Sequence, residues 1–166
     1  MDTIDVTILM PPQTLFNNVG YCQKDTIQFN DMSIANPMTW SWTFGDGSSD
    51  STQNPIHVYS FPGTYQIELT LTDSNGCGDT YSSLLTIDQV YDIDLGVDTN
   101  LCGGSLLLDA SVGANVNYTW STGQTDSAII ATFSAIYWVE IDNNGCKSAD
   151  SIVVKVMNVP TALFSS

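Results

Sequence analysis

Hydrophobic and polar residues alternate with a period of two in short segments along almost the whole chain. Successive side chains of a β-strand point to opposite faces, so this period predicts strands that are buried on one side. Gly, Asn, Asp, Ser and Pro separate the segments, and helical periodicity is nearly absent. Many short strands with frequent turn residues are typical of β-sandwiches. The predicted strands are Thr3–Leu9, Thr26–Phe29, Trp40–Phe44, Tyr65–Leu71, Leu84–Ile87, Tyr118–Trp120, Tyr137–Ile141 and Ile152–Val156.

The two halves of the chain share one order of features. Each half has a cysteine shortly before a strand, a tryptophan in an alternating strand, and a phenylalanine followed by a tyrosine that begins a long strand. Each long strand ends in the motif Asp-x-Asn-Gly-Cys, at 73–77 and 142–146. Asn-Gly is a strong hairpin signal, because a type I′ turn needs positive φ at both central residues. The shared order predicts an all-β fold of two tandem immunoglobulin-like β-sandwiches, with a short, stiff joint near residues 88–98.

The four cysteines, Cys22, Cys77, Cys102 and Cys146, allow three disulfide pairings. They form no C-x-x-C pair, so the spacing of a zinc finger is absent. Because the shared order repeats in each half, we expect Cys22–Cys77 and Cys102–Cys146, one disulfide per sandwich. Each bond would close a loop of roughly 45–55 residues and contribute about 4 kcal/mol in the chain-entropy model. Disulfides in a small module indicate an oxidising compartment.

The two ends of the chain resemble each other. Residues 2–16 and 150–164 match at Asp, Ile, Val, Pro, Leu and Phe positions, with an offset of 148 between Asp2 and Asp150. Similarity at a fixed offset is typical of tandem repeats, so we expect a section of a longer array. The expected division is 1–10 as the last strand of a preceding module, 11–90 and 91–159 as two complete modules, and 160–166 as the start of a following one.

The strand expected at 2–10 has no partner inside the two complete modules. An open strand edge with apolar residues promotes aggregation, so this segment must pair elsewhere. We expect it to pair with the preceding module of the same chain. The alternative is pairing with another copy of the protein, which would build a filament.

Charge narrows the range of partners. The chain has 166 residues, of which 18 are acidic and 3 are basic, and its formal net charge is −15 with no arginine. Such a surface repels nucleic acid and anionic lipid. No apolar run approaches the roughly 18 residues of a membrane span, so membrane insertion is not expected. The acidic surface is compatible with cation binding or simply with solubility outside the cell.

A set of residues in the first half gives it a resemblance to a known family. These are Trp42-Thr43-Phe44-Gly45-Asp46-Gly47, Asn54-Pro55, His57, Tyr59, Gly63-Thr64-Tyr65 and the alternating Ile67, Leu69 and Leu71. With them, the first half resembles the PKD domain, the immunoglobulin-like module named after the polycystic kidney disease protein. Thr43 stands where the family usually has an acidic residue. The resemblance implies a structural role for His57.

The second half resembles the bacterial Ig-like repeat that follows PKD modules in large secreted surface proteins. The matching residues are Leu95-Gly96-Val97-Asp98-Thr99-Asn100-Leu101-Cys102, Tyr118-Thr119-Trp120-Ser121-Thr122-Gly123, Tyr137-Trp138-Val139 and Asn144-Gly145-Cys146. Ala135-Ile136 replaces the usual Gly-Thr before the tyrosine. Such arrays occur in gliding-motility-associated and type IX-secreted adhesins, so the resemblance implies an extracellular array without enzymatic activity.

Two groups of residues are candidates for ligand binding. Trp138 should share the outward face of its strand with Glu140, where it could stack on a sugar of a surface glycan or bury in a neighbouring copy. The alternatives are that Tyr137 is the outward residue or that Trp138 packs under a loop. Asp92, Asp94 and Asp98 gather near the joint, and calcium prefers several oxygen ligands at once. No EF-hand loop motif is present, and a solvated acidic strand edge is the alternative.

Catalysis within these residues is not expected, because no nucleophile–base pair, metal cluster or phosphate loop stands out. The expected function is a structural and adhesive segment of a long extracellular repeat protein, with neighbouring modules of the same chain as partners. One alternative is the repeat unit of a surface filament built from copies of the protein. The other is an accessory carbohydrate-binding module of a secreted hydrolase.

Overall fold

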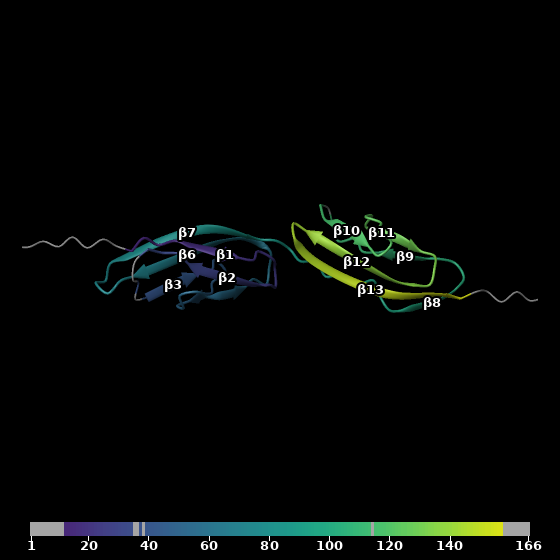
Figure 1. The fold of residues 1–166 in the computed structure, drawn as a ribbon, viewed down its shortest axis with the longest axis horizontal. Helices are drawn as coiled ribbons and strands as arrows, with labels where there is room; N and C mark the ends of the chain where they lie inside the picture. The colour runs from purple at the N-terminus through teal and green to yellow at the C-terminus, as the bar shows by residue number, and fades with distance from the viewer. Residues whose placement is uncertain (1–11, 35–36, 38, 114, 158–166) are drawn as a thin grey trace, which may run out of the picture. The chain divides into compact units, whose positions relative to one another are not determined.

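The computed structural model describes residues 12–34, 37, 39–113 and 115–157. Within these residues the regular elements are strands and none is a helix, so the predicted all-β class is confirmed. The chain divides into two compact units between Gln89 and Val90, each with its own hydrophobic core (Figure 1). The described part has no helix long and apolar enough to cross a membrane. The predicted strand at 3–9 and the segments 1–10 and 160–166 lie outside the described residues.

The first unit is a sandwich of two antiparallel sheets around an aromatic core. One sheet has the strand order β1-β2-β5 and the other β4-β3-β6-β7. The inward positions of both sheets are large and apolar, and Trp42, Phe29 and Tyr59 are fully buried between them. Its strands are β1 (Phe16–Val19), β2 (Thr26–Asp31), β3 (Thr39–Thr43), β4 (Ser49–Asp50), β5 (Ile56–Val58), β6 (Gly63–Thr72) and β7 (Gly78–Ile87).

The second unit has the same architecture with a smaller second sheet. One sheet has the order β10-β12-β13-β8, in which β8 runs parallel to β13, and the other pairs β11 with β9. Trp120, Val139 and Val154 are among the buried residues that form its core. Its strands are β8 (Thr99–Cys102), β9 (Leu106–Asp109), β10 (Asn117–Trp120), β11 (Ala128–Ala131), β12 (Ala135–Asn143) and β13 (Cys146–Met157).

The shared order of features corresponds to shared side-chain hydrogen bonds. The buried tryptophan of each unit donates its indole N–H to a backbone oxygen, from Trp42 to Thr52 at 3.0 Å and from Trp120 to Asp126 at 2.8 Å. The tyrosine at the start of each long strand donates its hydroxyl to the carbonyl four residues earlier, at Phe61 and Phe133. This tyrosine corner is a hallmark of immunoglobulin-like sandwiches. The predicted phenylalanine–tyrosine step is therefore a real structural element in both units.

The two Asn-Gly hairpins differ in backbone geometry. In the second unit Asn144 and Gly145 both have positive φ, 53° and 94°, and Asn143 pairs with Cys146 as in a tight two-residue turn. In the first unit only the glycine, Gly76, has positive φ, and a longer loop of residues 73–77 connects the strands. The predicted type I′ turn is confirmed for the second unit and wrong for the first.

The predicted disulfide pairing is wrong. Cys77 and Cys102 have free thiols, whereas Cys22 and Cys146 are disulfide-bonded. Cys22 lies beside Asp88, which follows the last residue of β7. Cys77 precedes the first residue of β7, so the two cysteines lie at opposite ends of this strand. A ten-residue strand spans roughly 33 Å, but bonded cysteines need Cα atoms within about 7 Å.

The same geometry rules out the other predicted pair. Cys102 lies opposite Met157 at the end of β13, whereas Cys146 is the first residue of that strand. The two members of each predicted pair are therefore at opposite ends of one long strand. The sandwiches are as expected, but neither contains the disulfide predicted inside it.

Candidate functional site

The turn between β3 and β4 begins at a position that only glycine can occupy. Gly45 has a φ of 79°, and a Cβ built on it would lie 2.7 Å from the carbonyl oxygen of Gln66 on β6. Both the backbone conformation and the close approach therefore exclude a side chain. The turn that follows places Asp46 and Ser48 at the edge of the sandwich, opposite His57 of β5.

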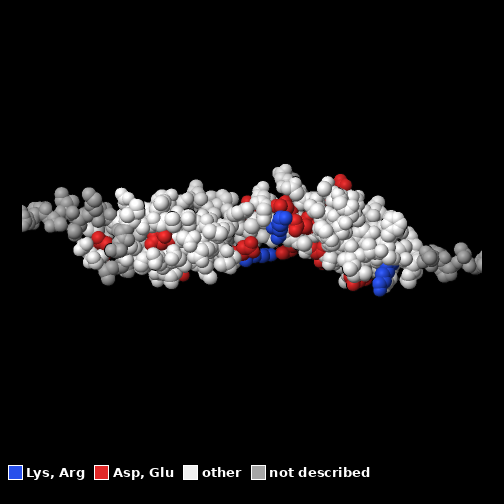
Figure 2. Space-filling model, viewed as in Figure 1, with Lys and Arg blue, Asp and Glu red and all other residues white. Residues whose placement is uncertain are grey.

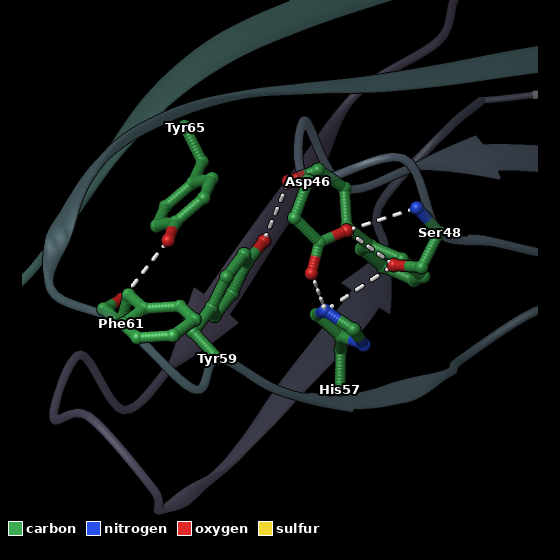
Figure 3. Close-up of polar contacts among 7 residues, drawn as sticks. Asp46, Ser48, His57, Tyr59, Phe61 and Tyr65 are labelled. Carbon is green, nitrogen blue, oxygen red and sulfur yellow. Dashed lines mark hydrogen bonds and ion pairs between the residues drawn. The ribbon is translucent and has the colours of Figure 1, made fainter.

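Asp46, Ser48 and His57 form a compact polar cluster (Figure 3). The Nε2 atom of His57 lies 2.7 Å from Oδ2 of Asp46 and 3.3 Å from Oγ of Ser48. The Ser48 hydroxyl donates to the other carboxylate oxygen, Oδ1, which also accepts the Ser48 backbone N–H at 3.0 Å. Asp46 thus bonds an amide of its own turn, as such turns commonly do. Because β5 belongs to the opposite sheet from β3 and β4, this cluster ties the two sheets together.

The cluster stabilises the ionised form of the Asp46 carboxyl. Burial alone would raise the pKa of Asp46, but hydrogen bonds from the hydroxyl and amide of Ser48 and from His57 outweigh it. The net result lowers the pKa of Asp46 from 3.8 to about 2. Asp46 therefore remains ionised across the physiological range and accepts hydrogen bonds without interruption.

A serine, a histidine and an aspartate in contact suggest hydrolase chemistry, but the geometry is unlike that of a catalytic triad. In a triad the serine bonds one ring nitrogen of the histidine and the aspartate bonds the other, so that the histidine removes the serine proton. Here one nitrogen, Nε2, faces both Asp46 and Ser48, and the serine proton points to the carboxylate. The cluster is arranged to hold a turn in place and does not activate a nucleophile.

Aromatic packing holds the histidine ring on its other sides. The ring of His57 stacks on Phe44 at 4.4 Å and meets Tyr59 edge to face at 4.6 Å. The hydroxyl of Tyr59, the residue after β5, donates to the carbonyl of Phe44 at 2.9 Å. This is a second hydrogen bond between the β5 segment and the turn after β3. Burial, together with the charge of Asp46, raises the pKa of Tyr59, so its hydroxyl stays protonated and remains a donor. These contacts support the structural role implied for His57.

Trp138 lies on an exposed face, as its strand pattern predicts. Tyr137, Val139 and Ile141 of β12 point into the core, whereas the side chain of Trp138 is 43% exposed. Ile136, on the same face, is 63% exposed and pairs with Val153 of β13. This face offers an apolar surface flanked by polar groups.

A shallow pocket that the sequence did not indicate lies along the same sheet. It is lined by Asp98, Thr99, Asn100, Val153 and Lys155. These residues come together because β8 runs parallel to β13, a pairing between segments more than fifty residues apart. Sequence periodicity has no signal for such a pairing. On the face drawn in Figure 2, most of the surface is uncharged, with acidic side chains in several places and few lysines.

The acidic residues proposed as calcium ligands are not gathered into a site. Asp94 accepts the backbone N–H of Gly96 at 2.8 Å, and Asp98 accepts that of Val153 at 2.9 Å. Among the described residues, no group of three or more His, Cys, Asp or Glu side chains is placed to hold a metal ion. The structure therefore does not bring Asp92, Asp94 and Asp98 together, and two of them instead fix local backbone.

Comparison with known proteins shows what the first unit is similar to. Residues 11–88 match the family model described as the PKD domain, so the resemblance expected for this half is confirmed. The PKD1 domain of the Vibrio cholerae metalloprotease PrtV has a TM-score of 0.44 and 24% identity, covering 48% of this chain and 99% of that domain. The PKD1 domain of Vibrio anguillarum Epp has a TM-score of 0.45 and 22% identity, covering 48% and 96%.

The similar full-length proteins are enzymes, but they match over a small part of their length. Collagenase ColA of Bacillus cereus is 40% identical over 52 residues, which are 31% of this chain and 5% of the collagenase. A microbial collagenase of Vibrio alginolyticus is 33% identical over 70 residues, which are 39% of this chain and 9% of that protein. The chain thus spans less than a tenth of either relative. The similarity is to a non-catalytic module.

Proposed function

We propose that the chain is a non-catalytic segment of a longer extracellular repeat protein, in which it spaces and stiffens an adhesive array. The observation that carries the proposal is the repetition of one skeleton in the two units, down to the tryptophan and tyrosine hydrogen bonds. The similarity of residues 2–16 to 150–164 extends that repetition beyond one pair of units. Stacked modules contact mainly their neighbours, so an array of them gains length without a larger core.

The polar cluster at Asp46 supports the same conclusion. It links the two sheets of the first unit and has the wrong arrangement for nucleophilic catalysis. Because the Asp46 carboxylate stays ionised at neutral pH, its hydrogen bonds between the two sheets persist there. In this role the module resists deformation, and other parts of the array carry out adhesion.

Electron microscopy of the intact protein tests the proposal. Isolated threads with regularly spaced beads support a spacer of tandem modules. Symmetric bundles or tubes would contradict it and favour the filament, in which lateral contacts between copies hold the assembly. Compact particles with one large domain would also contradict it, because they indicate an accessory module of an enzyme.

A second candidate is an accessory carbohydrate-binding module of a secreted hydrolase. The exposed Trp138 beside Ile136 motivates it, since an aromatic ring on a sheet face stacks well on a sugar ring. The similarity to a collagenase and a metalloprotease is compatible with an accessory position. Affinity electrophoresis in polysaccharide gels tests it. Trp138→Ala should weaken retention about tenfold, whereas Phe133→Ala, which removes an exposed aromatic side chain before β12, should leave it unchanged.

A further inference from the structure

The four cysteines occupy two equivalent positions in the two units. Cys22 lies four residues before β2, and Cys102 lies four residues before β9. Each of these two lies beside the end of its unit's last strand, Cys22 opposite Asp88 and Cys102 opposite Met157. We call this position the exit cysteine, because the chain leaves the unit there.

The other two cysteines also correspond. Cys77 and Cys146 both follow the Asn-Gly turn that precedes the last strand of their unit. We call this position the entry cysteine. In the first unit the chain enters at this end, because the backbone N–H of Thr14 donates to Asp79 at 2.8 Å, two residues after Cys77.

Equivalent positions differ in oxidation state. The exit cysteine of the first unit, Cys22, and the entry cysteine of the second, Cys146, are disulfide-bonded. The entry cysteine of the first unit, Cys77, and the exit cysteine of the second, Cys102, are free, and Cys102 is exposed. Each kind of position is therefore oxidised in one unit and reduced in the other. The cysteines left over are one exit and one entry cysteine.

We propose that Cys102 forms a disulfide with Cys77 of a second copy of this chain that follows it head to tail. The inference rests on the proposed repeat function, because it requires a following copy. Within the chain, the oxidised cysteines are one exit cysteine and one entry cysteine. The two free cysteines are also one of each kind, so the same combination can form between copies. A single head-to-tail contact of this kind is heterologous, so it repeats along a thread without closing.

Hydrogen bonds fix the backbone of the loop that contains Cys77. Asp73 accepts the backbone N–H groups of Asn75 and Cys77, at 2.8 and 2.9 Å, and its own N–H donates to the Cys77 carbonyl. These bonds fix the backbone of the loop, while the Cys77 side chain makes no disulfide. On the other side, the Gly103 N–H donates to the carbonyl of Met157 at 2.9 Å, which holds Cys102 at the exit end.

The chemistry is an ordinary thiol–disulfide exchange. A thiolate attacks the disulfide of a donor, which is a disulfide-bearing oxidoreductase or oxidised glutathione, and forms a mixed disulfide. The second thiolate then attacks the cysteine sulfur of that mixed disulfide. The Sγ–Sγ bond forms and the second thiolate of the donor leaves, the first having left when the mixed disulfide formed. The two electrons lost by the cysteines thus reduce an oxidoreductase to its dithiol, or oxidised glutathione to two glutathione thiols.

Two single variants of the full chain test the pairing. Cys77→Ser retains only the free Cys102, and Cys102→Ser retains only the free Cys77. One variant is labelled with ¹⁵N, and the two are mixed in a glutathione redox buffer at high salt, which screens the repulsion between acidic copies. Non-reducing intact mass spectrometry then counts mixed dimers and the two kinds of identical dimer. Random pairing gives twice as many mixed dimers as either identical dimer.

The proposal predicts a mixed dimer about tenfold or more above either identical dimer, which is about fivefold above random pairing and reflects a selective contact of about 1 kcal/mol. A ratio of two or below, or the absence of dimers, would overturn it. The double variant Cys77→Ser/Cys102→Ser should give no dimer and the same thermal unfolding as the parent, which shows that the substitutions do not disturb the fold.

Peptide mapping of the intact protein separates this inference from the proposed function. Non-reducing digestion should yield a Cys102 peptide linked to a Cys77 peptide. If beaded threads are seen but both cysteines are recovered as alkylated free thiols, the disulfide proposal fails while the spacer function stands.

Discussion

The two units close similar sandwiches by different means. In the first, the turn after the buried tryptophan strand is fixed by an ionised carboxylate, Asp46, bonded to His57 of the opposite sheet. In the second, the corresponding turn from Trp120 to Gln124 is held by neutral hydrogen bonds, including Trp120 N–H to the Gln124 carbonyl at 3.0 Å. The core and the tyrosine corner are thus common to both units, whereas this turn has an ionised carboxylate in the first unit and neutral hydrogen-bond partners in the second.

The largest expected effect comes from removing the buried tryptophan of either unit. Trp42 and Trp120 are 0% and 1% exposed, so truncation leaves a large cavity. Trp42→Ala and Trp120→Ala should each lower the free energy of unfolding of their own unit by about 3–5 kcal/mol. Hydrogen exchange measured by mass spectrometry resolves the two units. Equal loss of protection in both units after one substitution would show that they do not unfold separately.

A smaller difference should separate two glycines with similar backbone angles. Gly45 and Gly123 have φ of 79° and 83°, but a Cβ at Gly45 would meet Gln66 at 2.7 Å, whereas one at Gly123 would meet nothing within 4 Å. Gly123→Ala should therefore cost only the backbone strain, about 1 kcal/mol. Gly45→Ala should cost about 2 kcal/mol more, because β6 must shift. Urea denaturation measures both, and equal costs would mean that the close approach is unimportant.

Acid should weaken the stabilisation that the Asp46 cluster gives to the first unit. The folded pKa of Asp46, about 2, lies below its ordinary value of 3.8, so its stabilisation is fully present above about pH 4 and is lost as pH falls through about 2. The contribution is about 2 kcal/mol at most, because the side chain is partly exposed.

Asp46→Asn should therefore reduce the loss of stability of the first unit between pH 4 and pH 2. A residual loss should remain, because hydrogen bonds also lower the pKa of Asp31 and Asp50 against the effect of burial. Thermal unfolding followed across this range measures the effect. An unchanged pH dependence would show that the hydrogen bonds of Asp46 with Ser48 and His57 contribute no pH-dependent stability.

The smallest effect should be shared by both units. Tyr65→Phe and Tyr137→Phe each remove one hydroxyl bond to the carbonyl four residues earlier, at 2.9 and 3.1 Å. Each should cost about 1 kcal/mol. Chemical denaturation of the two variants should give similar losses, and a large effect in only one unit would mean that the two corners are not equivalent.

Sequence periodicity predicted the long strands well, because alternation depends only on which side chains are buried. It also placed Trp138 on the outward face of its strand. It gave only the last part of β7 and of β13, which begin at Gly78 and Cys146. Strands of two to four residues carry too short a period, and β1, β4, β5, β8 and β11 were missed. The disulfide pairing was missed for a different reason. Cys22 and Cys77 belong to the same unit, but the length of β7 separates them, and the repeated order of features contains no such distance.

The polar cluster shows another limit of the sequence. Asp46 and His57 are eleven residues apart, and Asp46 lies in a turn between two strands of one sheet whereas His57 lies in a strand of the other, so their contact depends on how the sandwich closes. The resemblance to the PKD domain assigned a structural role to His57 but did not identify its partner. The sequence also did not indicate that Asp94 and Asp98 accept hydrogen bonds from backbone amides.

Stretching the intact protein with a single-molecule force probe tests the central claim most directly. The measurement is made under reducing conditions, because the bond between Cys22 and Cys146 would otherwise shield the residues between them from the force. If the chain is part of a tandem spacer, extension should then give many unfolding events with two recurring contour-length steps, one for each kind of unit, because forced unfolding reports each module's own barrier. Only one or two events in the whole protein, followed by a single large domain, would contradict the account.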